Sequence, residues 1–260
     1  MEWTIWAGFA AGLLISTVTA PVGVSGAVFL LPVQLSVLGV PSPAVTPTNL
    51  LFNVVAGPGA LWRYRRDGAL RSRLARRLVA WTLPGVLAGA AIRVLALPGP
   101  TVFRLLVAAF LLPLGAWLCL RTLRPARRRP HLAEPSHRAL AALALTVGVI
   151  GGIYGIGGGS LLGPILAARG MPMSRLAPAT LAATFTTSIA GAAAYAVLAL
   201  MSSGPVAPEW WLGLACGAGG LAGGYLGALL QPHVPETALR LLLGALAAGL
   251  GALYAVQTLA

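Results

Sequence analysis

The sequence predicts an all-α polytopic membrane protein made of two inverted-topology repeats of about five helical segments each, with broken or short helices at the repeat interface. Three observations support this fold. The chain of 260 residues is 58% hydrophobic and only 9% charged, whereas a soluble domain carries about 25% charged residues. Its long apolar runs are separated by short loops. A stretch with eight glycines in 17 residues, 148–164, interrupts one of these runs.

The net charge of +13 comes with a distinctive distribution of the basic residues. All 18 of them are arginines; seven lie in 63–77 and six in 121–138. Both segments connect apolar runs, and the positive-inside rule places such loops on the cytoplasmic side. We therefore interpret the charge as a topology signal, also suited to anionic lipid headgroups, and predict no nucleic-acid partner.

The first half, 1–120, is predicted to be one transmembrane repeat. Its apolar pieces are residues 3–20, 25–38, 44–62, 78–96 and 101–120. The second piece is too short for a full span, which takes about 20 residues. A signal peptide cleaved after Ala20 is the alternative for the first piece, but Glu2 and the lack of a basic start oppose it.

The Arg- and Pro-rich segment 121–138 is predicted to be a cytoplasmic linker, and 139–260 the second repeat. The apolar pieces of this repeat are residues 139–154, 158–168, 176–200, 210–230 and 236–258. The second of them is again short. Both halves therefore have the same order of long and short pieces.

Glycines and prolines recur in the same order in both halves. An offset of 132 aligns Gly23 with Gly155, and an offset of 131 aligns Pro47 with Pro178. Arginines near 169–175 predict that span 176–200 runs from inside to outside, opposite to span 44–62. Such inverted repeats place substrate near the bilayer midplane, on discontinuous helices.

Each glycine-rich break is predicted to expose the first N–H groups of a half-helix, whose positive dipole end attracts anions. The predicted amide donors are those of Ser25, Gly26, Ala27, Gly157, Gly158, Gly159 and Ser160. The alternative is that the glycines allow close helix packing. A nucleotide phosphate loop is excluded, because no lysine follows the glycines and no βαβ unit surrounds them.

Polar side chains on apolar helices form a second group of candidates. Asn49 and Asn53 are four residues apart and share a helix face, and the repeat maps them onto Thr180 and Thr184. We predict that these four side chains select the anion, and that Tyr154 reaches it with its hydroxyl. Interhelical hydrogen bonding is the alternative role for the asparagines and threonines, and an ordinary core aromatic for Tyr154.

The sequence offers little for catalysis. None of the five acidic residues lies in the middle of an apolar run, so a proton relay or cation site has no support. The two cysteines and three histidines form no metal-ligand spacing. We predict no metal, no cofactor and no enzymatic activity.

The segment Gly152-Ile-Tyr154-Gly155-Ile-Gly157-Gly158-Gly159-Ser160-Leu-Leu-Gly163-Pro164 resembles the signature of the sulfite exporter TauE/SafE family. Met171-Pro172 and Ala177-Pro178-Ala179-Thr180 are similar to its continuation. The first half departs from the pattern, with Ser25 and Ala27 where the second half has glycine. The resemblance implies a multi-pass protein of the bacterial inner membrane that transports sulfite, thiosulfate, sulfoacetate or related organosulfonates.

The leading hypothesis is thus a secondary transporter or facilitator of small sulfur-containing anions. Its partners would be a small anionic substrate and the lipid bilayer, and a homo-oligomer is left open. The alternative is a non-transporting membrane partner or assembly component of a sulfur-metabolism complex, which would bind through the arginine-rich loops.

Overall fold

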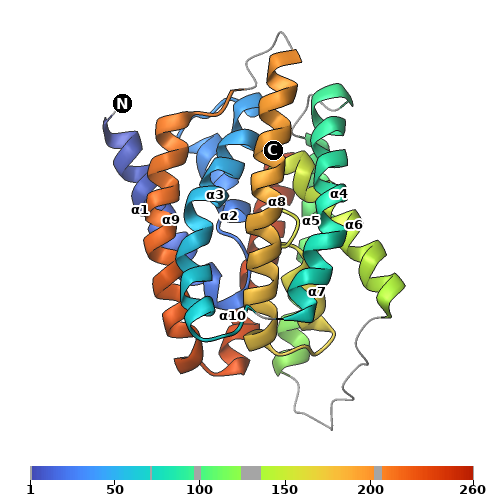
Figure 1. The fold of residues 1–260 in the computed structure, drawn as a ribbon. Coiled ribbons are helices and arrows are strands. Elements are labelled where there is room, and N and C mark those ends of the chain that lie inside the picture. Colours follow the sequence, from blue (N-terminus) through green and yellow to red (C-terminus); the bar gives the residue numbers. More distant parts are fainter. Residues whose placement is uncertain (1, 71, 97–100, 124–135, 202–206, 260) are drawn as a thin grey trace.

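The computed structural model describes residues 2–70, 72–96, 101–123, 136–201 and 207–259, which are entirely helical apart from turns (Figure 1). The elements of the first half are α1 (Glu2–Thr19), the 3-10 helix η1 (Ala20–Val22), α2 (Ala27–Ser36), α3 (Ser42–Arg66), α4 (Arg73–Ala96) and α5 (Thr101–Leu123). Those of the second half are α6 (His137–Tyr154), α7 (Leu162–Ala168), α8 (Met173–Met201), α9 (Trp210–Leu230), the 3-10 helix η2 (Gln231–His233) and α10 (Glu236–Leu259).

Six helices in the described residues are long and apolar enough to cross a membrane. They are α1, α4, α6, α8, α9 and α10, with α1 and α9 counted together with the 3-10 turns that follow them. The predicted fold class, a helical polytopic membrane protein, is therefore confirmed.

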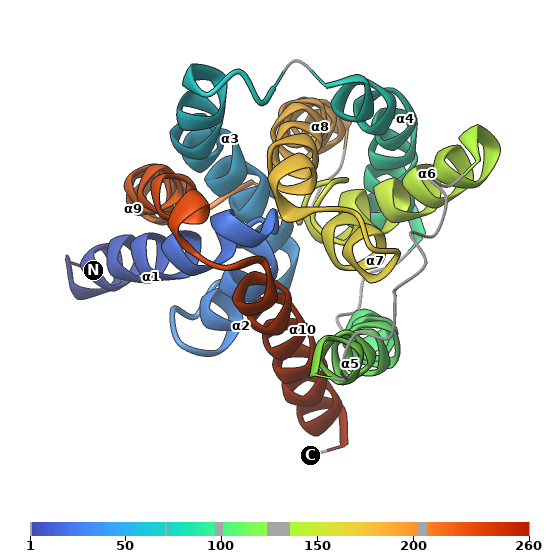
Figure 2. The same ribbon diagram turned by 90° about the horizontal axis from the view of Figure 1, so that it is seen from below.

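The long helices pack in pairs that mirror the two halves (Figure 2). α1 packs on α9 as α6 packs on α4, and α3 packs on α9 as α8 packs on α4. The remaining extensive pairs, α3 with α8 and α5 with α10, join corresponding helices of the two halves. Figure 1 also shows α3 and α8 running in opposite directions. The inverted repeat stays a prediction. Two repeats related in that way would pair their helices as observed here.

Helices α2 and α7 are too short to cross a bilayer. With 10 and 7 residues, they extend about 15 Å and about 10 Å, against a hydrocarbon core of about 30 Å. Each follows a long helix after a break. In each half the chain therefore runs into the bundle along the long helix, α1 or α6. After the break it reverses direction in the short helix, α2 or α7.

The helices extend further into the arginine-rich segments than the sequence predicts. α3 continues through Arg66 and α4 begins at Arg73, so the predicted loop 63–77 is a connection of residues 67–72 between two basic helix ends. Of the predicted linker 121–138, the start belongs to α5 and the end to α6, and residues 124–135 lie outside the described part. Arginine favours helix and its long side chain reaches past a helix end, so an arginine run does not by itself mark a loop.

Most of the glycine-rich stretch is helical. α6 continues through Gly148 and Gly152 and ends at Tyr154, and Gly155, which caps it, has a left-handed φ of 68°. A Cβ added at Gly152 would overlap the carbonyl oxygen of Val86 on α4. The glycines of α6 thus permit close approach to α4, which compensates in lipid for their low helix propensity. The break itself is limited to 155–161.

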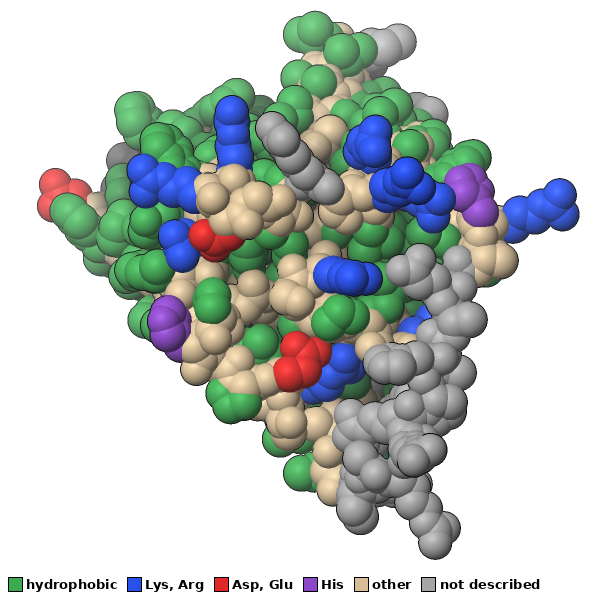
Figure 3. All heavy atoms as spheres, turned by 60° about the horizontal axis from the view of Figure 1, so that its bottom comes forward, with side chains coloured by type: hydrophobic (Ala, Val, Ile, Leu, Met, Phe, Trp, Pro, Cys, Tyr) green, Lys and Arg blue, Asp and Glu red, His purple; other side chains and the backbone are tan. Residues whose placement is uncertain are grey.

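One end of the molecule carries most of the described arginines, and we call it the arginine face. It comprises the C-terminal end of α3, the N-terminal end of α4 and the α7–α8 connection, with Arg66, Arg73 and Arg169. Figure 3, in which the bottom of Figure 1 is turned toward the viewer, shows several arginine side chains on the face that comes forward. The N-terminus lies at the opposite end, the far face.

Candidate functional site

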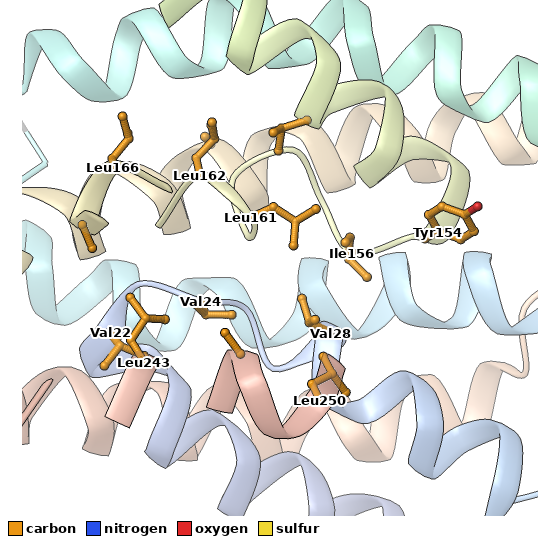
Figure 4. Packing of buried hydrophobic residues seen from close by; sticks show 14 of the residues in the cluster. Val22, Val24, Val28, Tyr154, Ile156, Leu161, Leu162, Leu166, Leu243 and Leu250 are labelled. Atoms are coloured by element: carbon orange, nitrogen blue, oxygen red, sulfur yellow. The ribbon is translucent and has the colours of Figure 1, made fainter. Parts of the chain in front are cut away.

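The two breaks face each other inside the bundle. Val24 and Val28 from the first half lie opposite Ile156 and Leu161 from the second, and all four belong to one buried apolar cluster (Figure 4). This contact fixes the two irregular segments in protein rather than lipid, as unpaired backbone groups require at membrane depth.

Hydrogen bonds from its own side chains and from α3 fix the conformation of the first break. Gly23 begins it with a left-handed φ of 72°. The Ser25 hydroxyl donates to the side-chain oxygen of Asn53, and it accepts from the backbone N–H of Ala27 at 3.1 Å. Ser25 thus bonds the first backbone N–H of α2 and ties the break to α3.

The second break is tied mainly to α8. The backbone N–H of Gly158 donates to Thr187 Oγ1 at 2.9 Å. The Ser160 hydroxyl donates to the Ile156 carbonyl at 2.6 Å and lies 3.4 Å from Thr184 Oγ1. These bonds satisfy one of the amides that the sequence predicts for the anion.

Asn49 and Thr180, the predicted counterparts, both bind the backbone of the first break. Asn49 Nδ2 donates to the carbonyl of Ala27 at 2.9 Å, and Thr180 Oγ1 donates to the carbonyl of Gly23 at 2.6 Å. Both therefore hold the first break in position from opposite halves of the chain, as interhelical hydrogen bonds do.

A cavity of about 40 Å³ lies beside the first break. Its lining comes from both halves: α1 and the first break, α3, α8 and α9. Four predicted site residues line it, which are Ser25, Gly26, Asn53 and Thr184. Lining residues with polar side chains that the sequence analysis missed are Ser16 and Thr19.

The other predicted site residues lie outside this cavity. They are Ala27, Asn49, Tyr154, Gly157, Gly158, Gly159, Ser160 and Thr180. The three consecutive glycines serve close packing: a Cβ at Gly157 would lie 2.5 Å from a methyl of Thr184, and one at Gly158 would lie 2.7 Å from Thr82 Cβ. Tyr154 is buried in the apolar cluster. In this conformation the first break, not the second, borders the cavity.

Thr19 has the clearest potential for binding. Its hydroxyl is buried, and it makes no hydrogen bond within the described part of the chain. An unsatisfied buried hydroxyl costs about 1–3 kcal/mol, and a polar ligand in the cavity would remove that cost. Ser16 and Thr19 are three residues apart at the end of an apolar helix, directly before the break, and that spacing on one helix face was the available sequence signal.

No charged side chain lines the cavity in the described residues. Gly26, at its wall, is also the residue that precedes the first turn of α2. The cavity thus combines hydroxyl and amide donors with the positive end of a helix dipole. Such a set favours a small anion over a cation.

Among the residues whose positions are described, no group of three or more His, Cys, Asp or Glu side chains is placed to hold a metal ion.

The family model described as "Sulfite exporter TauE/SafE" matches residues 8–254 of the chain. No curated protein and no solved structure matched. The family match covers both breaks, the cavity and nearly the whole length of both halves. This helical membrane protein therefore belongs to the sulfite exporter TauE/SafE family.

Proposed function

We propose that the protein is a secondary transporter or facilitator that moves small sulfur-containing anions across the membrane through the cavity beside the first break. The observation that carries this proposal is the lining: Thr19 and Asn53 offer neutral donors from two helices beside the first turn of α2, with no carboxylate among the described lining residues. Family membership supports an anion of the sulfite type.

The donor groups suit an oxyanion for an electrostatic reason. A hydrogen bond to a charged group contributes about 1.5–3 kcal/mol, roughly twice a neutral one. The Thr19 hydroxyl has no competing acceptor within the described residues, and the Asn53 amide makes only a long bond of 3.4 Å to Gly155. Both can therefore turn to an anion at little cost.

The volume of the cavity indicates which of the candidate anions it can hold in this conformation. A water molecule needs about 10–15 Å³ of such volume, so 40 Å³ holds about three. A sulfite ion is close to that size, whereas sulfoacetate adds a carboxymethyl group and requires a wider cavity. We propose sulfite and comparably small oxyanions as the substrates of this conformation, with thiosulfate and organosulfonates requiring helix movement.

The proposed transport cycle is alternating access. Inverted-repeat transporters expose a central site to one side and then the other by movement of one repeat against the other. The cavity lies between α3 and α8, which the predicted repeat relates to each other, and both halves line it. We place the arginine face in the cytoplasm of a bacterial cell, by the positive-inside rule.

Uptake of radiolabelled sulfite into proteoliposomes tests the proposal. Thr19→Val removes the hydroxyl and keeps the shape, so it should raise the sulfite concentration for half-maximal uptake about tenfold or more. The matched control is Thr146→Val, because Thr146 is exposed on α6 and bonds only its own helix, to the Ala142 carbonyl.

The control should transport normally. If Thr19→Val took up sulfite as the wild type does, Thr19 would not be part of the binding site. Wild-type protein that moves no sulfite, thiosulfate or sulfoacetate in either direction would overturn the proposed function.

A further inference from the structure

Two buried tyrosines make the same hydrogen bond at opposite ends of the bundle. Tyr64 on α3 donates its hydroxyl to the carbonyl oxygen of Ala20 at 3.3 Å. Tyr195 on α8 donates its hydroxyl to the carbonyl oxygen of Gly152 at 3.1 Å. Both rings are almost completely buried.

The two bonds correspond residue by residue. Tyr195 follows Tyr64 by 131 positions, and Gly152 follows Ala20 by 132, the two offsets that align the halves. Each acceptor lies three residues before the left-handed glycine at which its break begins, Gly23 or Gly155. Each tyrosine thus ties the long helix that leads into a break to the neighbouring helix.

The bonds lie on opposite sides of the site. Tyr64 is next to the arginines that end α3, at the arginine face, whereas Tyr195 lies near the end of α8, which runs the other way and ends at the far face (Figure 1). Each bond therefore closes the bundle toward a different membrane surface.

Tyr64 borders the cavity through its neighbours. It packs in one small cluster with Ala20 and Ala60, and both alanines line the cavity wall. Separation of Tyr64 from Ala20 would open that wall toward the arginine face. On the other side, Tyr195 packs with Leu50 and Ala90. Gly191, the counterpart of Ala60, lies against Leu50, whose side chain a Cβ there would meet at 3.2 Å.

Buried tyrosine hydroxyls usually find a partner, so one such bond would be ordinary. Two such bonds at corresponding positions of the two halves, each tied to the helix that leads into a break, indicate a role beyond pairing the hydroxyl. A net hydrogen bond of this kind shifts an equilibrium by about threefold to tenfold. That is enough to hold a path closed and weak enough to break in each cycle.

We propose that Tyr64 and Tyr195 are the gating residues of this transporter. The Tyr64–Ala20 bond closes the arginine face, the Tyr195–Gly152 bond closes the far face, and each bond breaks when its own side opens. In this structure both bonds are formed. The assignment rests on the proposed alternating access, but its test does not depend on the substrate.

Sided labelling in membrane vesicles tests the proposal. Cys119 and Cys216 are replaced by alanine, and one reporter is introduced by Ala60→Cys or Gly191→Cys. A membrane-impermeant maleimide is then added to inside-out or right-side-out vesicles, and the initial labelling rate is measured. Tyr64→Phe should raise labelling of the Ala60→Cys reporter from the arginine face by about threefold to tenfold. It should leave the Gly191→Cys reporter unchanged or slower.

Tyr195→Phe should give the reverse pattern from the far face. Tyr225→Phe on α9 is the matched control and should change neither rate. Backbone hydrogen exchange provides a second measurement without introduced cysteines: Tyr64→Phe should speed exchange around Ala20, and Tyr195→Phe around Gly152.

Equal effects of both substitutions on both reporters, or no effect on labelling and exchange, would overturn the gating role and leave two structural tyrosines. If each tyrosine substitution changed labelling from its own side only, but the protein moved no sulfur-containing anion, the gating role would stand. The proposed substrate would then be wrong.

Discussion

Asn53 joins the two halves of the protein at the point where their breaks meet: its side-chain N–H donates to the carbonyl oxygen of Gly155 at 3.4 Å. Its side-chain oxygen accepts from Ser25 in the first break. One amide therefore contacts both breaks and lines the cavity. Substitutions at this position should change anion binding more than substitutions elsewhere on α3.

Asn53→Asp keeps the shape of this side chain and adds a negative charge when it ionises. Two like unit charges about 5 Å apart repel by roughly 3 kcal/mol at an effective dielectric of about 20. Sulfite uptake should therefore fall more than a hundredfold, and the loss should deepen as the pH rises and the new carboxyl ionises. The measurement is the pH dependence of uptake in proteoliposomes.

The control is Gln257→Glu, the same change from amide to acid on α10 outside the cavity. It should transport sulfite at the wild-type rate. A variant Asn53→Asp with wild-type uptake at high pH would show that the anion passes elsewhere.

Phe185 separates the cavity from a large groove on the outside of the bundle. Its ring borders both the cavity and a groove of about 630 Å³ lined by Pro58, Leu61 and Trp62, with two arginines and a leucine. Phe185→Ala should join the two spaces, so that larger anions such as sulfoacetate enter more easily relative to sulfite. Competition between the two anions for uptake measures this ratio.

Ile189→Ala, four residues further along α8, truncates an exposed apolar side chain and is the matched control. Its selectivity should equal that of the wild type. An unchanged ratio in Phe185→Ala would mean that cavity width does not set selectivity.

Arg240 fastens the chain segment between α7 and α8 to α10. Its guanidinium donates to the carbonyls of Ala167 at 2.6 Å and Met171 at 2.8 Å, and it lies 3.0 Å from the Glu236 carboxylate. Arg240→Leu leaves these acceptors unpaired, the buried carbonyl of Ala167 among them, and should lower the free energy of unfolding by about 1–3 kcal/mol. The thermal unfolding midpoint in detergent measures the loss.

Arg169→Leu removes an arginine that is exposed at the same face. It should change the midpoint little, since exposed substitutions usually stay within about 0.5 kcal/mol. Similar midpoints for the two variants would refute a fastening role of Arg240.

Gly159 lies against the backbone of α8. A Cβ at this position would overlap the carbonyl oxygen of Thr180, so Gly159→Ala should destabilise the protein by about 1–3 kcal/mol. Gly249→Ala is the control, because a Cβ there meets nothing within 4 Å. The control should be neutral or slightly stabilising in the same unfolding experiment, and equal midpoints for the two variants would contradict tight packing at the second break.

Much of the architecture could be predicted from the sequence, because lipid demands long apolar helices and tolerates a break only inside protein. The short pieces around α2 and α7 and the breaks that begin at Gly23 and Gly155 follow from glycine and proline placement. The extent of α6 could not be predicted, since its glycines are compensated by contacts with α4 that only the tertiary structure shows.

The candidate site was predicted only in part. Ser25 and Asn53 line the cavity, whereas the glycine-rich second break, the stronger motif in sequence, packs against α8; substrate binding by any of these residues stays a prediction. Thr19 was missed because threonine is common in membrane helices. Only the position of its hydroxyl, buried beside a cavity without a partner in the described residues, distinguishes it.

The neutrality of the cavity lining has an energetic consequence. Because the described lining residues include no cationic side chain, we expect an anion that crosses by the proposed route to carry its charge through the membrane in an electrogenic step. Each elementary charge that moves through 100 mV gains or loses about 2.3 kcal/mol. In a cell with a negative interior the electric field therefore favours outward movement of such an anion.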